Sequence, residues 1–389
     1  MKFPTTFFKF PWDGSGIKSF LALTGLAAIA ATSLLSCKPE GGTGSNTIRI
    51  GAVLPLTGSL APYGKWSQNA IELATDDLRR AGQAIEVIVE DSRSSPKDAV
   101  SAFNKLQSVN KVPVIIGFIG SSEALACAPI ANETRTVLFS SAAASPDLSK
   151  AGDYVFRNRV SGSLEVEALG RYARNQLKLK NVAVIFINTD YGKSYESVFR
   201  EEFTRGGGTI ALAEGFDQGT TDFRSQIEKL LRQPGLDGVY LPVHTKEGAT
   251  FLKQAKELGL KVQFLASNAI ISPDLFTIAG NAAENLVYSE QAYDSGSSNE
   301  ATRKFDEAYS KRFGAHSEMF AANAYDAVRI VALAIKKGGY SADEIKQELY
   351  KIRDYPGASG QTTFDSNGDV QKPIAIKQIR NQASVVLTQ

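Results

Sequence analysis

The chain has 389 residues, which is more than one hydrophobic core usually supports, so two domains are expected. Hydrophobic residues make up 43% of it and charged residues 22%, the composition of an ordinary globular protein. The formal net charge is +2, and residues 1–36 account for it, because Lys2, Lys9 and Lys18 outnumber Asp13 there. The remaining chain is neutral overall and has no basic block, which argues against nucleic-acid binding.

An apolar segment at 20–35 follows these lysines and ends at Ser36 and Cys37. The run Leu34-Leu35-Ser36-Cys37 resembles the bacterial lipoprotein signal, in which the cysteine is acylated and becomes the mature N-terminus. We therefore expect a lipoprotein signal peptide at 1–36 and a lipidated, flexible tether at 37–46.

An uncleaved membrane anchor is the alternative, because the apolar segment is close to the roughly 18 residues that a span needs. Both alternatives place the rest of the chain outside the cytoplasm. Lipidation of Cys37 leaves Cys127 without a partner, so no intrachain disulfide is expected.

The first part of the chain alternates short apolar runs with amphipathic segments, which predicts a parallel α/β sheet with right-handed crossovers. Strands are expected at 48–54, 85–89, 112–116, 136–139 and 154–157. Helices are expected at 65–80, 96–109 and 123–132.

The pattern starts again at residue 162, without a close sequence repeat. Helices are expected at 162–177, 192–205, 221–232 and 246–258. Strands are expected at 182–187, 209–213, 238–242, 262–265 and 287–288.

Three successive helices, at 300–312, 318–337 and 341–352, then follow without an intervening strand. We expect them to return to the first sheet, and a hairpin with its turn at 365–368 to cross back. The predicted fold is α/β, with two Rossmann-like lobes joined by a three-crossing hinge around a cleft. Lobe 1 comprises 47–160 plus 291–368, and lobe 2 comprises 161–290 plus 369–389.

The segment 113–148 combines features of a ligand site. Gly117 and Gly120 turn the chain after a buried strand, and Ser121 and Ser122 stand where the next helix begins. Ligands bind beyond the carboxyl ends of such strands, and a helix N-terminus beside serine hydroxyls can receive a carboxylate. The alternative is that both serines only cap the helix.

Signals for catalysis are weak. Gly192-Lys193-Ser194 has the end of a phosphate-binding loop, but Ile187 stands where its first glycine is required. Neither a dinucleotide-binding glycine motif nor a nucleophile elbow is present. His244 follows a strand and could be a base, but no nucleophile or metal cluster accompanies it. We expect no enzyme activity, no cofactor and no metal.

Several segments in order resemble one known family: IRIGAVLPLTGSLAPYG, EDSRSSPKDAV, VIIGFIGSS, SSAAASPDL, NTDYGKSY, FLKQAKELGL and NAYDAV. They are similar to the type I solute-binding proteins of ABC importers, in particular the leucine/isoleucine/valine-binding group. The resemblance implies a type I periplasmic binding protein fold, a small ligand in the cleft, and ABC permease and ATPase partners. It also implies a monomer.

The resemblance assigns roles to individual residues. Ser121 matches the serine that holds an amino acid's carboxylate, and Ser122 is grouped with it. Ala142 matches a residue whose carbonyl accepts from the ammonium. Tyr63, Tyr191 and Tyr325 match aromatic positions that line the cleft or close over the ligand.

Two positions depart from the family pattern. Ala144 stands where a hydroxyl often contacts the ligand, and Asn268 stands where a carboxylate often balances its ammonium. Burying an ammonium without an anion is costly. The expected function is that of an ABC-importer lipoprotein that captures a small carboxylate-bearing ligand, a branched-chain or other amino acid.

Three alternatives remain: the same fold binding a non-amino-acid acid or an amide, a sensory ligand-binding receptor, and an extracytoplasmic enzyme. The absence of a signalling segment before Gln389 favours transport over sensing. The absence of a catalytic constellation disfavours the enzyme.

Overall fold

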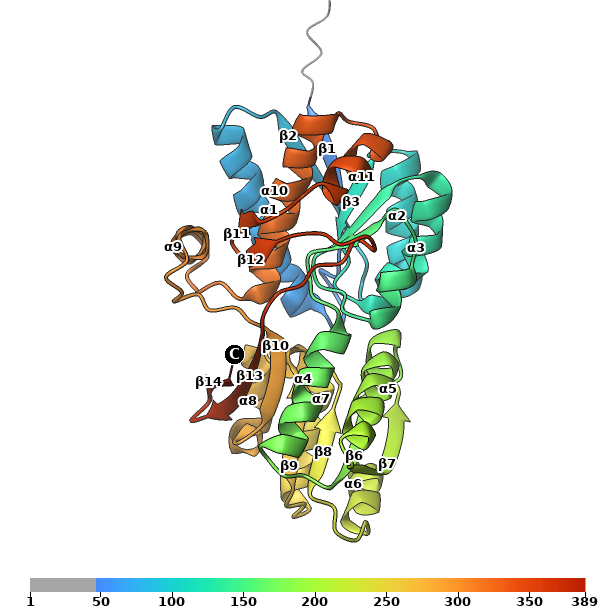
Figure 1. Cartoon of the computed structure of the whole chain (residues 1–389), viewed down its shortest axis with the longest axis vertical. Coiled ribbons are helices and arrows are strands. Elements are labelled where there is room, and N and C mark those ends of the chain that lie inside the picture. The colour runs from blue at the N-terminus through green and yellow to red at the C-terminus, as the bar shows by residue number, and fades with distance from the viewer. Residues whose placement is uncertain (1–46, 389) are drawn as a thin grey trace, which may run out of the picture. The chain divides into compact units, whose positions relative to one another are not determined.

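A computed structural model describes residues 47–388, which contain two large β-sheets, each with helices on both faces (Figure 1). A third, two-stranded antiparallel sheet consists of β11 Tyr355–Gly357 and β12 Gly360–Thr362. The expected signal peptide at 1–36, the acylated Cys37 and the tether at 37–46 lie outside the described residues. Within residues 47–388, no helix combines the length and the apolar character needed to cross a bilayer.

The first sheet is fully parallel, with the strand order β2-β1-β3-β4-β5. Its strands are β1 Ile48–Leu54, β2 Ile85–Asp91, β3 Val114–Gly117, β4 Val137–Ser140 and β5 Val155–Arg157. Its helices are α1 Ala61–Arg80, α2 Pro96–Ser108, α3 Ser121–Thr134, α9 Glu300–Phe313, α10 Met319–Gly338 and α11 Ala342–Tyr350.

Strand residues of this sheet alternate between two cores, as the two-residue period of a β-strand requires. Ala52 and Leu54 pack in the core that holds the apolar faces of α1 and α10, whereas Val53 packs with α2 and α3. The expectation that the late helices return to the first sheet is therefore confirmed, because α10 lies along α1 (Figure 1).

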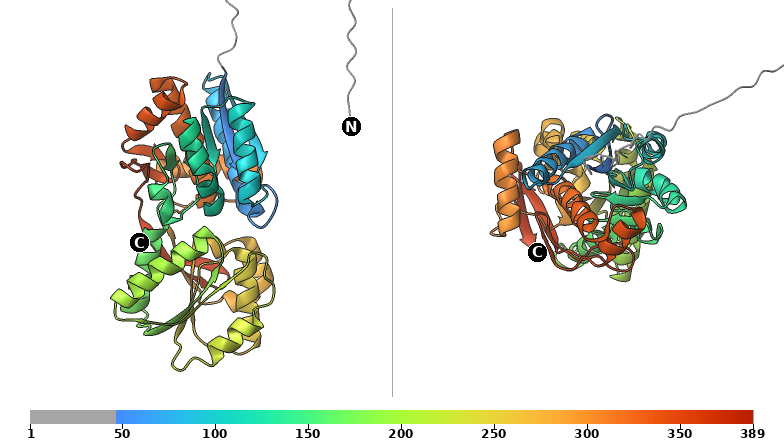
Figure 2. Two further views of the ribbon diagram at one scale, coloured as in Figure 1. Left: turned by 90° about the vertical axis from the view of Figure 1, so that its right-hand side faces the viewer. Right: turned by 90° about the horizontal axis from the view of Figure 1, so that it is seen from above.

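The second sheet has the order β14-β13-β10-β9-β8-β6-β7. Its strands are β6 Asn181–Ile187, β7 Thr209–Phe216, β8 Gly238–Leu241, β9 Gln263–Ser267, β10 Val287–Gln291, β13 Ile374–Arg380 and β14 Ala383–Thr388. Its helices are α4 Gly162–Asn175, α5 Asp190–Arg205, α6 Arg224–Leu231, α7 Thr245–Glu257 and α8 Pro273–Ala279. Figure 2 shows α4 and α5 on one face of the sheet and the later helices on the other.

The two sheets repeat one strand order. In the second sheet, β7-β6-β8-β9-β10 are parallel and correspond in order to β2-β1-β3-β4-β5 of the first. The antiparallel pair β13 and β14 extends the second sheet beyond β10. The strand order reverses between β1 and β3 in the first sheet and between β6 and β8 in the second, so each sheet has a topological switch point there.

The chain passes between the sheets three times, after Arg157, after Gln291 and after Val370. The last crossing comes two residues later than expected, because Val370 is buried in the core of the first sheet and forms an isolated bridge with Phe364. That the two halves move as separate lobes stays a prediction.

Three local expectations differ from the structure. Helix α1 begins at Ala61, four residues early, because Pro62 fits its first turn. The C-terminal hairpin is β13–β14, with Asn381 and Gln382 in left-handed conformations, whereas the 365–368 turn joins only the isolated bridge. Helix α8 was not expected, because seven residues are too few for a helical period to show.

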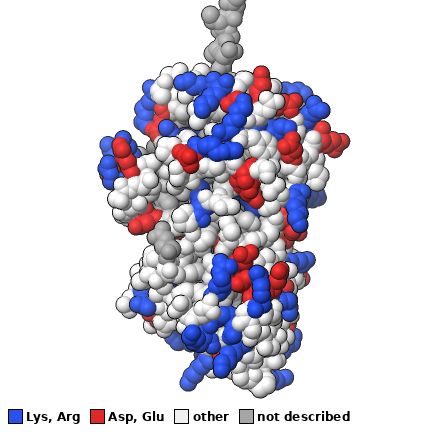
Figure 3. Space-filling model, viewed as in Figure 1, with Lys and Arg blue, Asp and Glu red and all other residues white. Residues whose placement is uncertain are grey.

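On the face shown in Figure 3, basic and acidic side chains are interspersed, in keeping with the balanced charge of the chain.

The ion pair of Arg157 with Asp369 is buried, unlike the charges on the surface, because Arg157 is only 1% exposed. Asp369 accepts from Arg157 Nε at 2.5 Å and Nη2 at 2.9 Å, and from Ser149 Oγ at 2.6 Å. The pair ties the end of β5 to the segment before the third crossing.

Replacing Asp369 with asparagine is expected to lower the free energy of unfolding by about 3 kcal/mol, because Arg157 then remains buried without its anion. Urea unfolding of both proteins measures the difference. Glu228→Gln, which breaks the exposed Glu228–Arg232 pair, is the control and is expected to change stability by less than about 0.5 kcal/mol. Equal losses in the two variants would contradict the structural role of Asp369.

Candidate functional site

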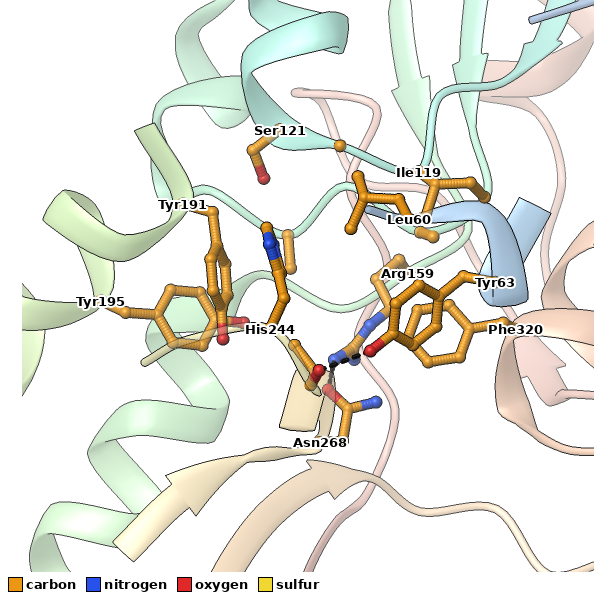
Figure 4. Close-up of a pocket in the computed structure, with 14 residues that line it drawn as sticks. Leu60, Tyr63, Ile119, Ser121, Arg159, Tyr191, Tyr195, His244, Asn268 and Phe320 are labelled. Carbon is orange, nitrogen blue, oxygen red and sulfur yellow. Dashed lines mark hydrogen bonds between the residues drawn. The ribbon is translucent and has the colours of Figure 1, made fainter. Parts of the chain in front are cut away.

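A pocket lies where the switch points of the two sheets face each other. The first sheet contributes residues that follow β1, β3, β4 and β5, and the second contributes residues that follow β6, β8 and β9. The lining residues are Leu60, Tyr63, Ile119, Gly120, Ser121, Ala142, Ala144, Arg159, Tyr191, Tyr195, His244, Asn268, Ala269 and Phe320 (Figure 4). The cavity that these residues enclose has a volume of about 40 Å³, which is room for a few water molecules.

The turn between β3 and α3 directs the N-terminus of α3 into this pocket. Gly117 has φ +106°, and a Cβ there would lie 2.3 Å from the carbonyl oxygen of Val53. The next residue, Phe118, is fully buried with φ 53°, a strained conformation for a side-chain-bearing residue. Such strain persists only where surrounding structure enforces it, and here the Phe118 N–H donates to Val53 O at 2.9 Å.

Ser121 is the first residue of α3 and does not cap it. The N-cap is Gly120, whose N–H donates to Glu123 Oε2 at 3.4 Å, while Ser121 Oγ accepts from the Ser145 N–H at 3.1 Å. Burial raises the pKa of Glu123 to about 7. The interpretation that Ser121 only caps the helix is therefore wrong, and its hydroxyl lines the pocket beside the positive end of the helix dipole.

Ser122 does not line this pocket, contrary to its grouping with Ser121. Its Oγ accepts from the Asp190 N–H at 3.1 Å, so it joins α3 to the start of α5 beside an adjacent hollow. One residue along a helix turns the side chain by about 100°, which separates the roles of the two serines.

Tyr63 lines the pocket and connects the two sheets. Its hydroxyl lies 2.6 Å from Thr245 Oγ1 and donates to the carbonyl of Ala269 at 2.6 Å, both in the second half of the structure. Its ring contacts Trp66 and Phe320, at centroid distances of 5.6 and 5.0 Å. Burial raises the pKa of Tyr63, so the hydroxyl stays protonated.

Tyr191 lines the opposite wall. Its hydroxyl is hydrogen-bonded to Ser267 Oγ, and its ring stacks on His244 with a centroid distance of 5.4 Å and an interplanar angle of 14°. Burial lowers the pKa of His244, against the opposing effect of Glu247, so the imidazole is neutral. His244 Nδ1 is buried without a hydrogen-bond partner. From the sequence, His244 was considered only as a catalytic base, whereas in the structure its ring lines the pocket beside Tyr191.

The placement of Tyr325 is a correction. Its hydroxyl donates to Asp77 Oδ2 at 2.6 Å, and its ring packs on Phe305 at 4.6 Å, between α1, α9 and α10 and away from the pocket. The aromatic residue that α10 contributes to the pocket is Phe320, in its first turn. Tyr325 lies five residues, more than one helical turn, after Phe320. The resemblance of NAYDAV therefore assigned Tyr325 to the cleft, whereas Phe320 is the residue of α10 that lines the pocket.

Ala142, Ala144 and Asn268 all line the pocket. Asn268 is 5% exposed, and its Oδ1 accepts from Arg159 Nη2 at 3.2 Å. The amide oxygen at this position therefore faces a cation of the protein itself.

Arg159 was missed by sequence reasoning. It is 2% exposed, and its Nη2 lies 2.6 Å from Glu165 Oε1. The sequence pattern that could have indicated it is an arginine between the apolar residues Val155, Phe156 and Val160. A glutamate follows six residues later, on the buried face of a helix, and is a suitable ion-pair partner.

Sequence and structure comparisons agree on one family. A leucine-, isoleucine-, valine-, threonine- and alanine-binding protein of Pseudomonas aeruginosa is 25% identical over 333 residues, covering 84% of this chain and 88% of the relative. The branched-chain amino acid transporter substrate-binding protein LivJ of Streptococcus pneumoniae, solved with isoleucine, is 28% identical with a TM-score of 0.81, covering 88% of this chain and 99% of the other.

A solute-binding protein of an ABC transporter from Rhodopseudomonas palustris, solved with 3,4-dihydroxybenzoic acid, is 26% identical with a TM-score of 0.76. The match covers 86% of this chain and 93% of that one. The expected type I periplasmic binding protein fold is thus confirmed. A family model described as "Periplasmic binding protein" matches residues 47–384, and the chain belongs to this family.

Proposed function

We propose that the protein is the extracytoplasmic solute-binding component of an ABC importer, and that it captures a small carboxylate-bearing solute between its two halves. The observation that carries this proposal is the pocket itself, which takes its walls from both sheets and has the N-terminus of α3 with Ser121 on one side (Figure 4). A ligand carboxylate suits that end of a helix, where free N–H groups and the dipole favour an anion.

Contacts across the pocket support capture by closure. Tyr63 bonds to Thr245 and Ala269, Ser122 accepts from Asp190, and Gln218 donates to Ser59. Each of these bonds joins the first half of the structure to the second. A solute that contacts both walls binds this arrangement better than an open one and shifts the population towards it.

The relatives support a carboxylate as the shared group of the ligand. The Pseudomonas relative is named for leucine, isoleucine, valine, threonine and alanine, and the two solved neighbours hold isoleucine and 3,4-dihydroxybenzoic acid. All of these solutes are small acids with a compact body. In this chain Leu60, Ile119 and Phe320 offer the apolar surface for such a body, and the tyrosines offer rings that can also hydrogen-bond.

The proposed partners follow from the same role. An importer requires permease and ATPase subunits, and a monomeric binding protein held at the membrane by a lipid on Cys37 delivers its solute to them. Cofactors and catalysis have no part in this function.

The direct test is a thermal-shift screen of the chain from residue 38 against amino acids, amides, and aromatic and short aliphatic acids. A ligand at 100 times its Kd is expected to add about 2.7 kcal/mol of stability. Trp66, the one tryptophan of that chain, lies in the aromatic cluster beside the pocket and reports binding by its fluorescence. A screen without any binder would contradict the proposal.

Replacing Ser121 with alanine is expected to weaken binding of the best acid from the screen by about 10- to 100-fold, because a hydrogen bond to a charged group is lost. Calorimetry measures both Kd values. Ser141→Ala is the matched control, since Ser141 is a buried serine that hydrogen-bonds Gly117 O and lies outside the pocket. Equal affinity of the Ser121 variant and the parent would remove Ser121 from the site.

Replacing Tyr63 with phenylalanine is expected to weaken the same ligand about 3- to 10-fold, because the hydroxyl that bridges the two halves is removed. Titration followed by Trp66 fluorescence gives the affinity. Tyr325→Phe also loses a tyrosine hydrogen bond, but within one half of the structure, and is expected to bind like the parent. A similar loss of affinity in both variants would argue against a bridging role for Tyr63.

Replacing Cys37 with serine is expected to abolish fatty-acid labelling in a bacterial host, because the sulfur that carries the lipid is absent. Cys127→Ala changes the only other cysteine and is expected to leave labelling intact. Continued labelling of the Cys37 variant would show that the lipid is attached elsewhere.

A further inference from the structure

The Arg159–Glu165 pair sits in the wall of the pocket with unused hydrogen-bonding capacity on the arginine. Arg159 Nη2 pairs with Glu165 and donates to Asn268, whereas Nε and Nη1 are buried and have no acceptor. Leaving N–H groups of a buried guanidinium without acceptors is costly, and most buried polar groups avoid it. Figure 4 shows the guanidinium between Tyr63 and Asn268, within the set of lining residues.

Glu165 is more fully engaged than Arg159. Its Oε1 accepts from the Gln291 N–H at 2.6 Å as well as from Arg159, and its Oε2 accepts from the Tyr195 hydroxyl at 3.0 Å. Burial acts to lower the pKa of Arg159, but Glu165, Tyr195 and Glu290 together more than offset this and the pKa is raised above its usual value. The arginine is therefore a permanent cation, and two of its nitrogens have no acceptor among the described residues.

For an ammonium the lining residues offer no negative charge, and the carbonyl that the family resemblance assigns to it, that of Ala142, is an uncharged acceptor. Among the described residues, no aspartate or glutamate belongs to the lining set, and Asn268 turns its amide oxygen to Arg159. Glu290, another carboxylate near Arg159, is paired with Lys377 at 2.5 Å. An ammonium in this space would meet a guanidinium and the positive end of α3.

We propose that Arg159 is a ligand-binding residue that donates to an oxygen of the solute, and that the solute is a small organic acid with a second oxygen acceptor and no ammonium. This inference rests on the proposed function and narrows its substrate class.

The test compares acids that differ only beside the carboxylate. Leucine, 4-methyl-2-oxopentanoate and 4-methylpentanoate form one series, and phenylalanine, phenylpyruvate and 3-phenylpropanoate form another. In a series whose carbon skeleton fits, the oxo acid is expected to bind at least about tenfold more tightly than the amino acid, and more tightly than the acid without the second oxygen.

The variant for this test is Arg159→Gln with Glu165→Gln, which removes both charges together so that neither remains buried and unpaired. It is expected to lower the preference for the oxo acid over the amino acid by about tenfold or more. Arg171→Gln with Glu167→Gln removes an exposed ion pair from the same helix and is the matched control, with no expected change in preference. Asn268→Asp is also expected to lower the preference for the oxo acid over the amino acid. The new carboxylate pairs with Arg159, which then donates less to the solute, and it can balance the ammonium of an amino acid.

The outcomes separate this inference from the proposed function. If an amino acid is the best ligand, if neither oxo acid binds while another solute does, or if the double variant keeps the parent's preference, the role of Arg159 is wrong and solute capture stands. If no solute of the wider screen binds, the proposed function fails and the inference fails with it.

Discussion

The three crossing segments between the sheets are bound to one another by buried polar side chains, and the pocket depends on this arrangement. Lys372, in the third crossing, donates to Asn158 Oδ1 in the first at 3.0 Å. Gln291, at the second, accepts from the Val160 N–H at 3.3 Å and donates to Asn323 Oδ1 of α10 at 3.1 Å. Burial lowers the pKa of Lys372 to about 7, against the opposing effect of Asp326. The network sets how the two halves face each other.

This constraint matters because each sheet alone supplies only half of a site. The first sheet presents Ser121 at a helix N-terminus, and the second presents Tyr191 and His244 beside its own switch point. A crevice at one switch point is a common place for a ligand. Two such crevices that face each other form the walls of a single pocket.

Much of this organisation could be predicted from the sequence, because it follows from local patterns. The run 112–116 and the glycines after it indicated a buried strand and a turn, and Ser121 followed from its place after them. The rest depends on distant contacts. Whether α10 offers Phe320 or Tyr325 to the pocket is decided by how it packs on α1. The pairing of Arg159 with Glu165 and Asn268 joins three elements, so no single stretch of sequence reveals it.

The two cores are both completed by segments near the end of the chain. Helix α10 fills the first core against α1, which lies early in the sequence, and β13 pairs with β10 at the edge of the second sheet. Contacts between such distant segments slow folding, because a long loop must close before they form. Without these segments the first sheet has an uncovered apolar face and β10 of the second sheet has an unpaired edge. The native contacts of both halves therefore cannot be completed before β13 is present.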